Sequence, residues 1–523
     1  MMINFFLFFI SLLTVGFSWL CFTSSVGVSL VDLTINGMYW NIFFNIDYVT
    51  IMILLMLIIC FGYAYFYTGH YFSNGVDGLE LNKLVCLFVG VMATLVCTGD
   101  LVSTLILWEY LGVISFFLIL FYANYLSLRA SVVTLVSSRF GDVCLFLLIS
   151  INLYCGYNFI ALSLILFFII FTKSAGFPFI SWLLEAMRAP TPVSSLVHSS
   201  TLVAAGVWFS MRYDIFNFIS SPNFYCCLLL LTIFITGVCC FFFMDLKKIV
   251  ALSTCNNISW CVLYLLLGDV TLSLFQLISH GVSKCLLFML VGDVMSGSGG
   301  SQASNCVYSP RLYGNLGIFG LFSIVLGLSG APFIGVFFTK HLLISGFNNS
   351  VSLVLLTFLS FCVFLSYFYS FRLCSILLNF NTSLSCGVIY SFSSGLMVYF
   401  WLFINFALSS YLDELSSVSV NFSVMLLSFQ IFSCLTAYYF YSSLLFSSWS
   451  SSLFGCDNLV ELVFSLFSVL LTSISAFFYR WDNNTLSLFN NHGFSAINII
   501  NFNLLNILIV STLFTFIMCF ILC

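Results

Sequence analysis

Charged side chains are scarce in this chain of 523 residues, which holds only 13 basic and 17 acidic residues, or 6% of the sequence. A soluble globular protein is typically about a quarter charged. Hydrophobic residues make up 62%, and too little polar surface remains to cover a body in water. Disordered chains, secreted disulfide scaffolds and basic nucleic-acid-binding proteins need far more polar or positive sequence, so these classes are excluded. The composition is that of a polytopic membrane protein.

A cysteine-based metal or redox motif is also missing. The 21 cysteines are scattered, and no two stand at the C-x-x-C spacing. The thiolate ligands of a metal ion or an iron–sulfur cluster must converge on one point. These cysteines instead lie on separate apolar segments, where cysteine behaves as a small hydrophobic residue. We therefore expect no metal site and no iron–sulfur cluster.

Apolar runs of about 20 residues, the length of a membrane span, recur along the whole sequence. They predict an all-α polytopic membrane protein with about 15 to 16 transmembrane helices. The runs lie near residues 3–22, 46–67, 84–100, 103–122, 132–152, 157–189, 193–213, 224–244, 249–268, 271–294, 312–345, 351–378, 386–408, 423–447, 458–479 and 503–522. The first run lacks a basic segment and a cleavage site, so we expect a retained helix. We expect N-terminal helices in 1–100, a core in 101–378 and C-terminal helices in 379–523.

Two of these segments combine helix-breaking residues with a lysine. The residues are Lys173 and Pro178 in segment 157–189, and Gly330, Pro332 and Lys340 in segment 312–345. An interrupted helix in lipid frees backbone groups, so breaks are placed where protein or water can satisfy them. Paired breaks are typical of transporter repeats, and we expect two broken helices in antiporter-like repeats. The order of proline and lysine differs between the two segments, so the repeat itself stays a hypothesis.

Four ionisable residues lie inside apolar runs: Glu109, Lys173, Lys284 and Lys340. A charge at the centre of a membrane helix costs about 2.5 to 3.5 kcal/mol, so such residues usually face a partner or a water path. Burial favours the neutral form of a lysine and a nearby carboxylate favours the charged form, so opening and closing an ion pair can load and unload a proton. The pattern indicates proton relay. Snorkelling side chains or static ion pairs between helices are the alternative.

Two histidines extend this inventory. His280 and Lys284 are four residues apart, hence on one helix face, which suits proton transfer between them. His198 is followed by three hydroxyl side chains, at 199–201, which are possible water ligands. For either histidine the alternative is a core side chain hydrogen-bonded to a carbonyl group.

For other charged residues the sequence predicts a structural role. Arg139 and Asp142 are three residues apart and predict a local ion pair at a helix start. Lys247 and Lys248 follow Asp245 between two apolar runs, which favours an anchor at the membrane interface over a catalytic role.

Six ordered motifs resemble the antiporter-like, proton-pumping subunits of respiratory NADH:ubiquinone oxidoreductase, or complex I. They are WEYLGVISFFLI from Trp108, SRFGD from Ser138, KSAGFPFISWLLEAMRAPTPVSSLVHSSTLVAAG from Lys173, DLKKIVALST from Asp245, SHGVSKCLLFM from Ser279 and SGAPFIGVFFTK from Ser329. The motifs lie between Trp108 and Lys340, and the resemblance covers about residues 40–375. A chance match to six motifs in the expected order is negligible, although each alone would be weak.

The resemblance implies roles for the buried charges. Glu109 is similar to the acid of the family's Glu–Lys pair, and Lys173 to its partner on the broken helix. Lys284 is similar to the central relay lysine and Lys340 to the lysine of the far access path.

The same resemblance assigns the remaining polar residues. His198 is similar to the histidine that joins the first lysine to the centre, and His280 to the histidine before the central lysine. Asp142 and Arg139 are similar to the polar pair beside Glu109.

The resemblance also implies what lies outside the chain. We expect no cofactor in this chain, since NADH, FMN, iron–sulfur clusters and ubiquinone bind to other subunits of the complex. The expected partners are the other membrane-arm subunits, among them the antiporter-like chain 4, and the lipid bilayer, with no nucleic acid. The expected location is the mitochondrial inner membrane, which the 65 phenylalanines against six lysines also suit, as in a thymine-rich organelle genome.

The sequence departs from the family at two places. His341 follows Lys340 where the family usually has aspartate, so an ion pair with that neighbour is not expected. Only 43 residues follow Arg480. A helix over 482–502 would measure about 32 Å, so we expect the family's long lateral helix to be reduced or absent.

Two other functions stay open. An Mrp-type cation/proton antiporter subunit shares the same motifs by ancestry, and a structural membrane subunit could use its buried charges only to hold helices together. The series Glu109, Lys173 and Lys284 favours proton relay over the structural role.

Overall fold

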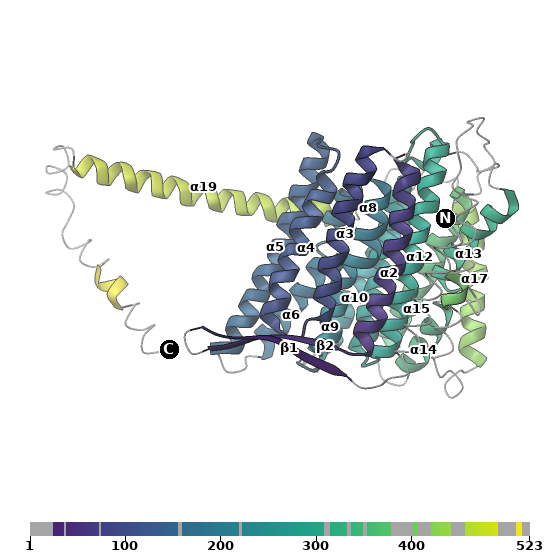
Figure 1. Ribbon diagram of the computed structural model, residues 1–523, viewed down its shortest axis with the longest axis horizontal. Coiled ribbons are helices and arrows are strands. Elements are labelled where there is room, and N and C mark those ends of the chain that lie inside the picture. Colours follow the sequence, from purple (N-terminus) through teal and green to yellow (C-terminus); the bar gives the residue numbers. More distant parts are fainter. Residues whose placement is uncertain are drawn as a thin grey trace. The chain divides into compact units, whose positions relative to one another are not determined.

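The computed structural model of the chain (Figure 1) describes residues 25–35, 38–72, 75–154, 159–218, 222–307, 314–331, 336–348, 353–377, 401–405, 420–440, 456–489 and 509–514. Its two compact units are Met1–Phe454 and Gly455–Cys523. The described residues contain 11 helices that are long and apolar enough to cross a membrane, which confirms the all-α membrane fold. The expected span at 3–22 and most of those at 386–408 and 503–522 lie outside the described residues. The three-part division stays a prediction.

The first unit contains a β-hairpin that the sequence analysis did not predict. Strand β1 (Val26–Ile35) pairs antiparallel with β2 (Met38–Ile46), and Figure 1 shows the hairpin across the lower ends of the neighbouring helices. The sequence between the strands is Asn36-Gly37, a strong hairpin signal when β-favouring residues flank it.

Arg212 joins this hairpin to the helices. Its guanidinium contacts Asp47 Oδ2 at 2.5 Å and donates to Asn45 O at 2.5 Å and Thr98 O at 3.0 Å. The Arg212 side chain is only 7% exposed. Since hydrogen bonds to charged groups are the stronger ones, this residue fixes the hairpin in place.

Replacing Arg212 by Met should loosen the hairpin by about 3 kcal/mol, because a largely buried charge pair loses one partner. The measurement is the rate of proteolysis within residues 26–46 of the intact protein. Arg129→Met, at an exposed position on another helix, is the matched control and should leave that rate unchanged. Equal cleavage of Arg212→Met and the native protein would show that the guanidinium does not hold the hairpin.

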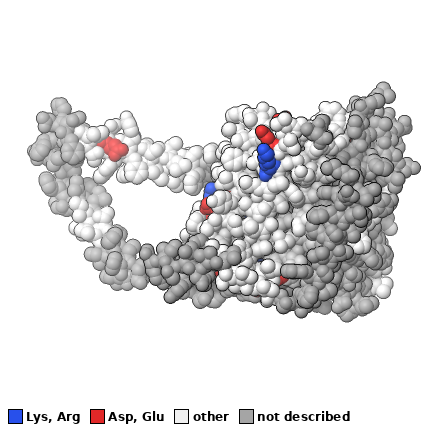
Figure 2. Space-filling model, in the orientation of Figure 1, with Lys and Arg blue, Asp and Glu red and all other residues white. Residues whose placement is uncertain are grey.

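Four long helices follow the hairpin: α2 (Tyr48–Tyr71), α3 (Val76–Cys97), α4 (Leu101–Leu120) and α5 (Tyr125–Tyr154). Large apolar side chains such as Phe117, Val136 and Phe146 are more than half exposed on α4 and α5. Figure 2 shows one face of the molecule, where the described charges form only a few isolated groups. Apolar residues outside and polar residues inside are the arrangement expected of a bundle in lipid.

The first predicted break is confirmed. Helix α6 (Phe159–Ser174) ends one residue after Lys173, a turn follows, and α7 (Ser181–Ala186) resumes the segment. Ala175 adopts a positive φ of 57°, and its carbonyl accepts a hydrogen bond from Cys255 Sγ at 3.0 Å. A backbone group freed by the break is thus satisfied by a neighbouring helix, as burial in a membrane protein requires.

A second irregularity lies where one continuous helix was expected. Helices α8 (Thr191–Leu196) and α9 (Leu202–Arg212) are joined by a single π-helical turn, η1 (Val197–Thr201). The hydrophobic pattern of the segment gives no sign of this turn, which contains His198. Such turns are frequent at functional sites.

The other predicted break separates α13 (Gly314–Ser329) from α14 (Phe337–Asn348). Gly330 stands at φ 94°, a conformation that glycine adopts without strain. Its carbonyl accepts a hydrogen bond from Gln430 Nε2 at 2.8 Å. Gln430 belongs to α17 (Val420–Phe440), which packs against α15 (Leu353–Leu377).

The core of the first unit is α12 (Val270–Gly297), whose spanning window is entirely buried. It packs against α2, α8, η1, α13 and α11 (Leu246–Leu266), and α11 in turn packs against α10 (Pro222–Phe242). Two short 3₁₀ helices lie in connections between helices of this unit. They are η2 (Ile215–Phe218), after α9, and η3 (Ser304–Cys306), after α12.

The second unit consists mainly of α19 (Cys456–Phe489), a helix of 34 residues and hence about 51 Å long. The expectation that a span ends near residue 479 is wrong, because α19 continues through Arg480 to Phe489. The expectation that the lateral helix is reduced or absent stays a prediction. Arg480 is exposed, and a solvated charge does not interrupt a helix. Counting residues after Arg480 therefore underestimated the longest helix of this region.

Candidate functional site

Arg139 stands between two carboxylates at the first candidate group. Its Nη1 lies 3.2 Å from Glu109 Oε1, on α4, and 3.5 Å from Asp142 Oδ2, one turn along α5. The Asp142 side chain is 4% exposed, against 35% for Glu109. The predicted pair Arg139–Asp142 is confirmed, although it lies in the middle of α5 and not at a helix start.

Lys173 is buried at the end of α6 and forms no ion pair within 4 Å among the described residues. Its Nζ lies over the Trp108 ring, 5.1 Å from the centroid, and beside Gly112, where an added Cβ would be 3.9 Å away. The expected Glu109–Lys173 ion pair is therefore not formed. Glu109 instead pairs with Arg139, which is half exposed and reaches the carboxylate without the cost of burial that the lysine bears.

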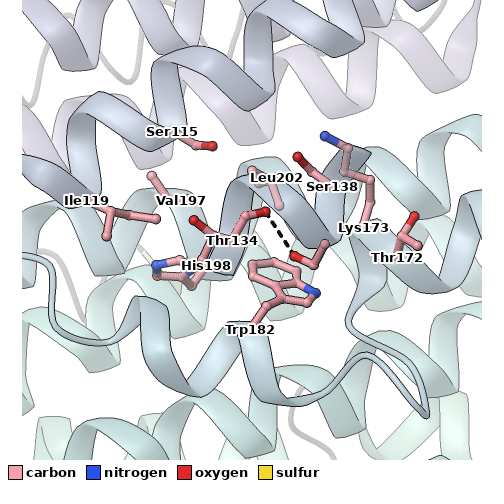
Figure 3. A pocket seen from close by; sticks show the side chains of 11 residues that line it. Ser115, Ile119, Thr134, Ser138, Thr172, Lys173, Trp182, Val197, His198 and Leu202 are labelled. Carbon is pink, nitrogen blue, oxygen red and sulfur yellow. Dashed lines mark hydrogen bonds between the residues drawn. The ribbon is translucent and has the colours of Figure 1, made fainter. Parts of the chain in front are cut away.

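A small polar cavity extends from Lys173 to His198 (Figure 3). Figure 3 shows Lys173 and His198 at opposite sides of Thr134 and Trp182. Further hydroxyl groups line the cavity, from Ser115, Ser137, Ser138 and Thr172. Its volume of about 10 Å³ is close to what one water molecule needs.

The π turn sets the surroundings of His198, which is fully buried. The hydroxyls of Ser199, Ser200 and Thr201 donate to backbone carbonyls at Ser195 and Leu196. These hydroxyls are committed as donors to their own helix, and their oxygen atoms can still accept hydrogen bonds. That they bind water stays a prediction.

The central pair lies on α12, and the continuous helix places His280 and Lys284 on one face, as predicted. Both side chains are buried. Lys284 Nζ donates to Ser253 Oγ and to Val250 O, at 3.3 Å for the carbonyl, both on α11. Neither ring nitrogen of His280 has a hydrogen-bond partner among the described residues.

Lys340, on α14, is held by neutral oxygen atoms. Its Nζ donates to Ser329 O at 2.5 Å and to Ser366 Oγ at 2.6 Å, and it lies 4.4 Å from the centroid of the Tyr367 ring. No acidic side chain within the described residues pairs with it. His341 is buried beside it.

A second cavity, again of about 10 Å³, lies beside Lys284. Lys284 and Ser253 line one part, and Ser329, whose carbonyl binds Lys340, lines another. Asn257, Tyr369 and Ser370 add polar groups. The sequence reasoning missed these partners because single hydroxyl residues are common in the chain and carry no signal by themselves.

Lys247 and Lys248 have different surroundings, because successive helix residues point about 100° apart. Lys248 is half exposed and lies 3.3 Å from Asp245 Oδ2. Lys247 is 5% exposed, and its Nζ donates to Ala189 O at 3.3 Å. The prediction of an interface anchor is therefore wrong for Lys247.

Comparisons with known proteins identify the family of the chain. A family model for the transmembrane region of NADH:quinone oxidoreductases and Mrp antiporters matches residues 98–366. NADH-ubiquinone oxidoreductase chain 5 of Caenorhabditis elegans is 30% identical over 469 residues, which cover 84% of this chain and 87% of the relative. That of Ascaris suum is 32% identical over 409 residues, covering 72% of each chain.

A solved structure shares the fold. A chain of the Mrp complex from Dietzia sp. DQ12-45-1b superposes with a TM-score of 0.69 at 18% sequence identity. The match covers 86% of this chain and 54% of that chain.

Proposed function

Because the chain belongs to the transmembrane family of NADH:quinone oxidoreductases and Mrp antiporters, and within it to the chain 5 subunits, we propose that it translocates protons as a core membrane subunit of complex I. The run from Ala189 to Thr201 favours chain 5 among the antiporter-like subunits, and the names of the relatives confirm that prediction. Electron transfer from NADH to ubiquinone supplies the energy.

The observations that carry the proposal are three buried lysines and two small cavities, the first lined by Lys173 and the second by Lys284. The first cavity extends from Lys173 to His198, and the second from Lys284 to Ser329, which binds Lys340. None of the three lysines pairs with a carboxylate within the described residues. A buried lysine without a permanent counter-ion is poised to release its proton, since its charged form lacks compensation.

The ion pair between Glu109 on α4 and Arg139 on α5 controls, in this proposal, whether Lys173 binds a proton. While Arg139 holds Glu109, the negative charge is compensated and Lys173 is left without it. If Glu109 moves to Lys173, the charged lysine is stabilised and a proton is taken up. Return of Glu109 to Arg139 favours its release toward His198.

The redox centres belong, in this proposal, to other subunits, and this chain binds no cofactor. Its partners are the other membrane-arm subunits, including chain 4, and its location is the mitochondrial inner membrane. The chain 5 names of the relatives support membership in a multi-subunit membrane complex.

The shared fold with an Mrp complex keeps a second function in view, a cation/proton antiporter subunit that works without NADH. A structural subunit is the third possibility. A structural subunit would need the positive charges of the lysines but would not need the lysines to bind and release protons. This difference can be tested.

The test compares Lys340→Met and Lys340→Arg in sealed vesicles that contain the assembled complex. NADH oxidation and the inhibitor-sensitive proton gradient are followed together. Both variants should lower proton translocation by about fivefold, less than the loss of a central proton-transfer group. Arginine keeps the charge but stays protonated, so it cannot relay a proton.

Each alternative gives a different result. A structural subunit would keep native pumping in Lys340→Arg. An antiporter would show cation-driven proton movement in the native vesicles and none driven by NADH. Either outcome would contradict the proposed function.

A further inference from the structure

A buried acid–histidine pair lies outside the lysine series. His70 Nε2, in the last turn of α2, is 3.6 Å from Asp293 Oδ1, near the end of α12. The Asp293 side chain is 2% exposed, whereas that of His70 is 23% exposed. The pair therefore connects the interior of the bundle with its surface.

Because the partner of Asp293 is a histidine, the charge of Asp293 is not permanently compensated. A lysine or arginine would compensate the buried carboxylate permanently, but neither residue type lies within 4 Å of Asp293 in the described part of the chain. Histidine is charged only when it binds a proton, and it exchanges that proton near neutral pH. An ionisable pair of this kind inside a membrane bundle is suited to proton transfer more than to permanent cohesion.

The neighbouring Gly292 brings α8 close to the pair. A Cβ added to Gly292 would lie 3.5 Å from Thr191 Cβ and 2.5 Å from the Tyr67 hydroxyl. Thr191 is buried, and its hydroxyl has no hydrogen-bond partner among the described residues. The first residue of α8 thus offers a hydroxyl without a hydrogen-bond partner among the described residues beside Gly292, the residue that precedes Asp293.

From Thr191, buried hydroxyls continue toward His198, and those of Ser194 and Ser195 donate to the backbone carbonyls of Thr191 and Pro192. Ser194 and Ser195 follow at three and four residues, and His198 comes after one further turn, all on α8 and η1. Spacings of three and four residues place side chains on one face of a helix. Seven residues at about 1.5 Å each cover about 10 Å, and both α8 and η1 pack against α12 along this distance.

We propose that His70 and Asp293 form a proton-transfer site that exchanges protons between the surface at the ends of α2 and α12 and His198, through the hydroxyl side chains of α8. The proposal rests on the proposed function. The proton on Nε2 of the His70 imidazolium passes to Oδ1 of Asp293, which leaves a neutral imidazole and a carboxylic acid. The acid then donates its proton into the hydroxyl series, and His70 takes another from water.

The experiment uses the assembled complex in sealed vesicles, with Asp293→Asn, Asp293→Glu and His70→Gln. Asparagine keeps the size and hydrogen-bonding capacity of aspartate but does not titrate, so Asp293→Asn should lower NADH-driven proton translocation by about tenfold, the low end of the loss of a proton-transfer group. Asp293→Glu restores a carboxylate and should recover most of the native rate. Asp269→Asn, at the exposed opposite end of α12, is the matched control.

A cohesive ion pair would give another pattern. Native translocation in an assembled Asp293→Asn complex would overturn the proposal. If that variant does not assemble, His70→Gln decides, because it leaves Asp293 in place: a rate lowered several-fold supports transfer through the pair, and a native rate overturns it. Loss of pumping in Lys284→Met beside native pumping in Asp293→Asn would leave the proposed function standing and remove only this site.

Discussion

Replacing Lys284 by Met is expected to lower NADH-driven proton translocation by about 100-fold, because the central group that must bind and release each proton is lost. Lys284, on α12, lines the second cavity, and its ammonium donates to Ser253 Oγ and Val250 O in the described structure. Methionine fills a similar volume without a charge. Exchange of a buried charge for an apolar side chain is often neutral for stability, so the complex should still assemble.

The measurement follows NADH oxidation and the inhibitor-sensitive gradient in the same vesicles. Ser283→Ala is the matched control, since Ser283 is buried next to Lys284 and its hydroxyl donates only within α12. That variant should pump at the native rate. Native pumping by an assembled Lys284→Met complex would remove Lys284 from the path and favour the structural subunit.

The spans and both helix breaks could be predicted because their causes are local. Long apolar runs can be recognised without knowledge of their neighbours. Pro178 restricts the backbone, and Gly330 permits a positive φ, whatever surrounds them. The candidate lysines could be found for the same reason, since a charge in an apolar run is costly in any surroundings. What satisfies each break, Cys255 in one and Gln430 in the other, depends on helices far away in sequence.

The partners of the charges could not be predicted from spacing. Glu109 had two possible cations, Arg139 and Lys173, and only the distances between α4, α5 and α6 select Arg139. Ser253 and Ser366 bind lysines 31 and 26 residues away, and nothing in their own segments marks them. The π turn around His198 has the same origin, because packing of η1 against α12 and α8 is a tertiary contact.

Replacing Lys173 by Met is expected to abolish coupled pumping as completely as the change at Lys284, although for a different reason. In the proposed mechanism Glu109 leaves Arg139 to reach Lys173, so loss of this lysine removes the step at which movement of the carboxylate leads to proton transfer. Electron transfer and the gradient should fall together by about 100-fold in a complex that still assembles.

Lys173→Arg separates titration from charge at this position. Arginine would attract Glu109 but would not release a proton, so it should pump no better than methionine. Ser174→Ala is the matched control, because the Ser174 hydroxyl donates to Ile170 O at 2.8 Å within its own helix and does not line the cavity. If Lys173→Arg pumps at the native rate, the positive charge alone is what the site needs. The exchange of Glu109 between Arg139 and Lys173 would then be a structural rearrangement, not a proton-transfer step.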